Sequence, residues 1–168
     1  MDKKFIKPDR GSTPQPDHIM LSFCGDPRYE MAVTWRTDLS ADDGFVELFD
    51  PEGNKTAIEA VCRVIESDID ISKFNTALIK NLLPGTTYTY TCGDTSNRSR
   101  RFSFTTQEEG CSKFKFIVIS DHQVGDPWPE PDYTRVKNML VTAIEQNPDI
   151  RFILTAGDNC DDGQNEIQ

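Results

Sequence analysis

The sequence lacks long apolar runs, which argues against a chain that crosses a membrane as a helix. No hydrophobic stretch approaches the roughly 20 residues that such a helix requires. The first residues include several lysines, but no apolar segment follows them, so they do not form a recognisable signal peptide. Internal repeats and low-complexity tracts are missing as well. These absences indicate a globular protein.

Positive charge is also scarce. The 168 residues contain 18 lysines and arginines against 28 acidic residues, a net charge of -10. Basic side chains favour binding to a nucleic acid or an anionic membrane because they displace its bound counterions. An acidic protein has no such advantage, so this charge balance argues against both partners. An anionic substrate would need a local source of positive charge, such as a metal ion.

Histidine is rare, and cysteine shows no metal-binding or redox spacing. The two histidines are His18 and His122, and none of the five cysteines belongs to a Cys-x-x-Cys motif. An odd number of such cysteines favours free thiols in a reducing compartment over a disulfide framework. We therefore favour a cytoplasmic location. A chain from which an export leader had been removed would show the same composition.

Residues 14–106 alternate between short runs of apolar and polar residues and separators rich in Gly, Pro, Asp and Asn, which favour turns. The pattern predicts strands at residues 18–23, 30–37, 44–50, 56–65, 74–82, 86–93 and 101–105. Seven strands at this spacing are typical of a β-sandwich.

Two aromatic residues favour the same architecture. Trp35 is in phase with Met31 and Val33, so it can fill the space between two sheets. Tyr88 has the spacing of a tyrosine corner, in which a buried ring returns its hydroxyl to nearby backbone. The segment resembles a fibronectin type III-like module. We expect His18, at the start of the first strand, to be structural.

The C-terminal third predicts a βαβ unit. An apolar run over residues 114–120 leads into Asp121, and a second run over residues 151–156 leads into Asp158. Between them, residues 132–147 have the apolar spacing of a helix. A right-handed crossover would make the strands parallel and bring both acids to one sheet edge.

Asp121, Gln123 and Asp158 are the candidate site. Carboxylates at the ends of adjacent strands can hold divalent metals, and one can bridge two ions about 3.5–4 Å apart. The alternative is that each acid simply belongs to a turn. His122 lies next to these residues and is a further candidate for contact with metal or substrate.

These motifs resemble those of a known family. Residues 121–123 and 157–163 resemble the first two metal-binding blocks of a calcineurin-like metallophosphoesterase. Residues 31–37 and 82–88 resemble the N-terminal domain of purple acid phosphatase-like proteins. The resemblance implies an all-β sandwich followed by the first βαβ unit of an α/β metallophosphoesterase domain. Together with the polar composition of residues 1–13 and 107–113, it divides the chain into a polar leader (1–13), a sandwich (14–106), a linker (107–113) and a partial phosphoesterase domain (114–168).

The resemblance also implies roles for individual residues. Asp121 would bind the first metal, and Asp158 would bridge two divalent ions (Fe, Zn or Mn) whose hydroxide attacks a phosphate ester. Where the family often has His, this chain has Gln123, which is either a weaker ligand or the holder of a water. Asp161 stands where the purple enzymes have Tyr, so no purple iron chromophore is expected.

The later histidine-containing blocks of the family do not appear before Gln168. We therefore expect the chain to be the N-terminal fragment of an acid phosphatase-like hydrolase, lacking a catalytic general acid and inactive alone. The family resemblance also allows export. The alternative is a non-catalytic β-sandwich module for binding or interaction, with a remnant hydrolase segment. A sheet cut after two strands would leave an edge through which the chain could self-associate.

Overall fold

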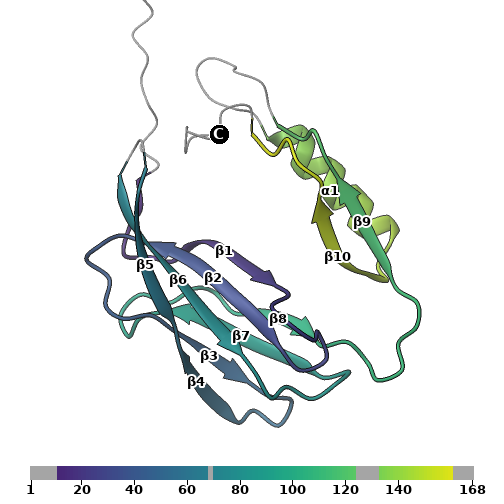
Figure 1. The fold of residues 1–168 in the computed structure, drawn as a ribbon, viewed down its shortest axis with the longest axis horizontal. Helices are drawn as coiled ribbons and strands as arrows, with labels where there is room; N and C mark the ends of the chain where they lie inside the picture. The colour runs from purple at the N-terminus through teal and green to yellow at the C-terminus, as the bar shows by residue number, and fades with distance from the viewer. Residues whose placement is uncertain (1–10, 68–69, 124–132, 161–168) are drawn as a thin grey trace, which may run out of the picture. The chain divides into compact units, whose positions relative to one another are not determined.

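A computed structural model describes residues 11–67, 70–123 and 133–160 of the chain (Figure 1). The chain divides into two compact units, one spanning Gly11–Cys111 and one that continues from Ser112. Residues 1–10 of the expected leader and Asp161 lie outside the described residues. None of the helices in the described part has the length and hydrophobicity of a membrane-crossing segment.

The first unit is a sandwich of two four-stranded antiparallel sheets (Figure 1). One sheet has the order β1 (Asp17–Ser22), β2 (Met31–Thr37), β6 (Ile71–Ile79), β5 (Val61–Glu66). The other has the order β4 (Lys55–Glu59), β3 (Phe45–Phe49), β7 (Thr87–Gly93), β8 (Phe102–Thr105). The predicted β-sandwich is confirmed.

The inner faces of the two sheets form one hydrophobic core. Trp35 is 1% exposed and lies in this core with Met31 and Val33, as the alternation along β2 predicts. The remaining core residues are Val46, Leu48, Ala77, Ile79, Leu82, Tyr88, Tyr90, Cys92 and Phe104.

One expected strand is in fact two. Residues 56–65 include most of β4 and most of β5, with a break at Ala60, whose N–H donates to the Gly44 carbonyl at 3.0 Å. On one side of the break β4 pairs with β3, and on the other β5 pairs with β6 in the opposite sheet. The prediction of a single strand was wrong because no Gly or Pro within residues 56–65 marks the crossing from one sheet to the other.

The tyrosine corner is present. The Leu83 N–H donates to the Tyr88 hydroxyl at 3.0 Å, and the Tyr88 ring is buried. Tyr88→Phe removes this acceptor, so we expect the free energy of unfolding to fall by about 1 kcal/mol in urea titrations. Tyr90→Phe is the matched control, because the Tyr90 hydroxyl has no hydrogen bond among the described residues. Equal losses in both variants would contradict a specific role for the corner.

The second unit contains β9 (Lys115–Ile119), α1 (Thr134–Gln146) and β10 (Ile150–Thr155). The strands are parallel, and their register pairs Ile117 with Ile153 and Ile119 with Thr155. Helix α1 lies alongside the two strands (Figure 1). The observed elements agree with the predicted βαβ unit.

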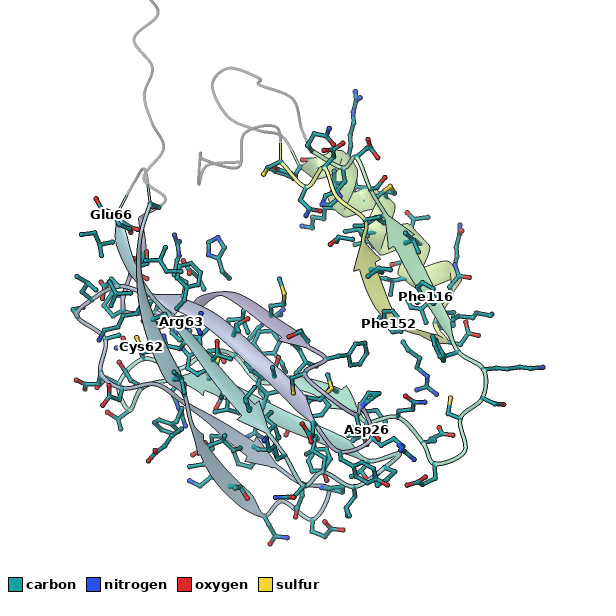
Figure 2. All side chains as sticks on the ribbon, in the orientation of Figure 1. Asp26, Cys62, Arg63, Glu66, Phe116 and Phe152 are labelled. Atoms are coloured by element: carbon teal, nitrogen blue, oxygen red, sulfur yellow. The ribbon has the colours of Figure 1, made fainter. Side chains whose placement is uncertain are left out.

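Aromatic side chains join the two strands near their amino ends. The rings of Phe116 and Phe152 stack with their centroids 5.0 Å apart and an interplanar angle of 10° (Figure 2). The Phe114 ring is tilted by 43° to both, with its centroid 6.0 Å from that of Phe116 and 5.8 Å from that of Phe152. These contacts hold the register at one end of the strand pair, and the candidate acids lie at the other.

Candidate functional site

The two strands of the second unit end side by side. Beyond β9 and β10, the Ala156 N–H donates to the Ile119 carbonyl at 2.8 Å. The Asp121 N–H then donates to the Gly157 carbonyl at 3.3 Å, and the Gln123 N–H donates to the Asp158 carbonyl at 3.2 Å. The parallel pairing therefore continues past the strands and brings the two predicted blocks together, backbone against backbone.

Both candidate acids have an unusual backbone conformation. Asp121 has φ 51° and Asp158 has φ 46°, in the left-handed region that non-glycine residues seldom adopt. Aspartate tolerates this region better than most residues, but each such conformation still costs on the order of 1–3 kcal/mol. Strained residues of this kind cluster at functional sites, and here one follows each strand.

The side chains around these acids include two polar atoms without partners. His122 Nδ1 and Gln123 Oε1 are buried and form no hydrogen bond among the described residues. A buried polar atom without a partner costs about 1–3 kcal/mol. The carboxylates of Asp121 and Asp158 belong to exposed residues, and Ser120 donates a hydrogen bond to Asp121. Unpaired nitrogen and oxygen atoms and exposed carboxylates are the kinds of ligand that bind metal cations.

These residues fit part of a metal site. Among the described residues, no group of three His, Cys, Asp or Glu side chains is arranged to hold a metal ion. Two carboxylates, one amide oxygen and one imidazole are too few for the two ions that the resemblance implies, since a single Zn²⁺ ion already takes four ligands. A complete shell would need ligands from outside this group.

The other histidine belongs to the sandwich unit. His18 lies in β1, is exposed, and has its Nδ1 3.0 Å from Asp17 Oδ1. Its φ of 48° coincides with an irregularity in the pairing of β1 with β2. These features are consistent with a structural role for His18 in β1.

A second candidate is a hollow of about 400 Å³ in the sandwich unit, which the sequence does not predict. It is lined by Asp26, Pro27, Arg28, Gln107, Glu108, Gly110 and Cys111. Asp26 is labelled in Figure 2. The Arg28 guanidinium lies 2.6 Å from the Asp26 carboxylate and 3.0 Å from that of Glu109. The hydrogen bond from Arg28 holds the pKa of Asp26 below its usual range. Since both partners of Arg28 are acids, its charge is compensated and the hollow offers little to a phosphate group.

Comparisons with known proteins found a family model that matches the sandwich and a solved structure that is similar over most of the chain. Residues 16–106 match a family model described as the purple acid phosphatase N-terminal domain. A purple acid phosphatase isolated from yellow lupin (Lupinus luteus) seeds has a similar structure, with a TM-score of 0.69 and 22% sequence identity. The match covers 87% of this chain and 30% of that one, so the chain spans about 30% of the lupin protein's length. At this identity the similarity concerns the fold.

A weaker similarity links the chain to the sensor domain of an anti-sigma factor from Pseudobacteroides cellulosolvens. The TM-score is 0.35 at 12% identity, over 54% of this chain and 76% of that one. No curated protein matches the chain.

Proposed function

Because the chain belongs to the family that contains the purple acid phosphatase N-terminal domain, we propose that it is the N-terminal part of a metal-dependent phosphoesterase. The substrate class would be phosphate esters. The observation that carries this proposal is the backbone pairing that brings Asp121 and Asp158 to the ends of neighbouring parallel strands. Ligands of open α/β sheets bind at this edge. The fold similarity to the lupin phosphatase, which extends over most of the chain, supports the order of sandwich and βαβ unit.

The chain's own residues would hold and orient the metal ions. Asp121 and Asp158 would supply carboxylate oxygens from the two strand ends, and His122 and Gln123 follow Asp121 directly in the chain. Two divalent ions, when bound, supply the positive charge that polarises a phosphoryl oxygen and activates water. In a protein of net charge -10, such a local source of positive charge would be needed to attract a phosphate ester. The general acid and the phosphate-binding groups would come from outside the described residues.

Metal titration of the chain tests this proposal. We expect calorimetry to detect Mn²⁺ binding with a dissociation constant weaker than about 10⁻⁵ M, because few ligands converge. Asp158→Asn replaces one ligand oxygen by an amide and should weaken binding by about 10-fold or more. Asp149→Asn is the matched control: it makes the same substitution in the same unit, but before β10, where Asp149 pairs with Lys115 at 2.7 Å.

Two results would contradict the proposal. Equal loss of binding in Asp158→Asn and Asp149→Asn would show a general effect of negative charge. No binding by the unaltered chain at millimolar Mn²⁺ would favour the alternative function, a non-catalytic sandwich module. The finding that favours this alternative is that the described residues contain no group of three His, Cys, Asp or Glu ligands. Tight binding of two ions, by contrast, would show that the chain alone provides a more complete site than we expect.

A further inference from the structure

We propose that the chain forms a dimer through β5, whose free edge pairs antiparallel with the β5 of a second copy and thereby joins one four-stranded sheet from each copy. This inference is independent of the proposed function, because it concerns the sandwich unit and requires no metal. The surface is a backbone edge, and the partner that such an edge recognises is an extended strand.

The strand β5 is a regular edge strand. It stands at the end of the order β1-β2-β6-β5, at the margin of its sheet (Figure 1), and each of its six residues pairs with a residue of β6. Ser67, which follows β5, donates its N–H to the carbonyl of Asp70, which precedes β6, at 2.9 Å. Within the described part of the chain, β5 pairs with no strand on its other side. Backbone groups on that side can therefore accept a further strand.

The side chains of β5 are apolar and uncovered. Val61, Val64 and Ile65 are 71%, 60% and 47% exposed, and every residue of the strand is exposed. Val64 is in phase with Cys62, which lies opposite the buried Asn75, so Val64 belongs to the inner side of the sheet and yet stays exposed. An exposed, apolar and regular edge strand favours pairing with another strand.

The other three edge strands of the sandwich are protected. The pairing of β1 is irregular, with His18 at φ 48°. The strand β4 has a charged residue at each end, Lys55 and Glu59, and β8 has only four residues. Irregularities, charges and short lengths are the means by which proteins prevent edge-to-edge association. By contrast, β5 pairs without a bulge, and its interior contains one charge, Arg63, which is labelled in Figure 2.

The sequence of β5 suits a second copy of itself. Facing residues of two antiparallel strands lie on the same face of a sheet, and a two-fold axis can pass through a residue that faces its own counterpart. With the axis at Val64, two valines face each other and Arg63 faces the partner's Ile65. With the axis at Arg63, two like charges would face each other, which is destabilising. The second copy also has a free β5 edge of its own, so one contact satisfies both.

Sedimentation of the full chain at increasing concentration tests the proposal. We expect a monomer–dimer equilibrium with a dissociation constant on the order of 10⁻⁴ M, because one strand pair forms a small interface. Val64→Lys places two positive charges at the centre of the pair and should weaken dimerisation by about 10-fold or more. A reducing agent is present throughout, since Cys62 is an exposed thiol on β5.

The matched control is Leu78→Lys. It makes the same kind of substitution at a side chain that is 47% exposed, but on β6, which has a strand paired on each side. Dimerisation of this variant should stay within about twofold of the parent, the usual range for a surface substitution away from an interface. The melting temperatures of both variants should match that of the parent, because both side chains are exposed.

Hydrogen exchange locates the interface. Part of the N–H groups of an edge strand point away from its neighbour, and a second strand would protect them. We expect exchange in residues 61–66 to slow by about threefold or more between about 10 µM and 1 mM protein, as the dimer becomes the main species. Exchange in the edge strands β4 and β8 should not change.

Several results would overturn the proposal. One is a chain that remains monomeric at about 1 mM, ten times the expected dissociation constant. Another is a dimer in which β5 exchanges at the same rate at both concentrations, which would place the interface elsewhere, for example at the free edges of β9 and β10. Equal weakening by Val64→Lys and Leu78→Lys would indicate a general effect of surface hydrophobicity. None of these results affects the metal titrations of the second unit, so the two proposals fail separately.

Discussion

Trp35→Ala is expected to lower the free energy of unfolding of the sandwich by about 3–5 kcal/mol, the range for large aromatic residues replaced by alanine in a core. Trp35 is 1% exposed and lies in the core between the two sheets. The backbone of Gly44 approaches the ring so closely that an added Cβ would lie 2.7 Å from Trp35 Cζ2. A site this tightly packed leaves a large cavity when the ring is removed.

Urea unfolding followed by far-UV circular dichroism measures this effect. Fluorescence is unsuitable because Trp35 is one of two tryptophans. Leu78→Ala is the control, since Leu78 lies on the neighbouring strand β6 but is 47% exposed. Trp35→Phe should cost less than Trp35→Ala, because it keeps a ring and removes Nε1, which has no hydrogen-bond partner among the described residues. A loss for Trp35→Ala no larger than that for Leu78→Ala would contradict the assignment of this core.

Gly93→Ala is expected to be similarly damaging, with a loss of about 3 kcal/mol or more from the combined strain and overpacking. Gly93 ends β7 with φ 133°, and a Cβ there would lie 2.0 Å from the Asn97 carbonyl oxygen. That oxygen cannot easily move away, because it accepts a hydrogen bond from the Asp94 N–H at 3.1 Å. The Asp94 carboxylate in turn accepts hydrogen bonds from the N–H groups of Ser96 and Asn97.

Gly53→Ala separates the two causes of this loss. Gly53 also has a positive φ, 85°, but nothing lies within 4 Å of an added Cβ. This variant should therefore show the backbone strain alone, about 1–2 kcal/mol. The difference between the two variants, measured by the same urea titrations, gives the cost of the clash with Asn97. Equal losses of unfolding free energy in the two variants would show that the turn after β7 rearranges to accommodate the added Cβ, despite its hydrogen bonds.

Much of the fold could be predicted because it depends on local patterns. Side-chain alternation along residues 31–37 placed Trp35 in the core, and the spacing of Leu82 to Tyr88 identified the corner. Continuous apolar runs indicated the strands of the βαβ unit, and an apolar periodicity of 3.6 indicated its helix. The break at Ala60 escaped prediction because the choice of a partner strand in either sheet involves residues distant in sequence.

For the candidate site, the sequence by itself determined which residues follow each strand: Asp121, His122 and Gln123 after the first and Asp158 after the second. Only the tertiary structure decided that Gln123 lies against Asp158, that both aspartates have a left-handed backbone, and that Gln123 Oε1 is buried without a partner. The physical reason is that residue identity and periodicity are properties of neighbouring positions. Hydrogen bonds between two strand ends, and the burial that leaves one acceptor unsatisfied, exist only after distant segments have packed together.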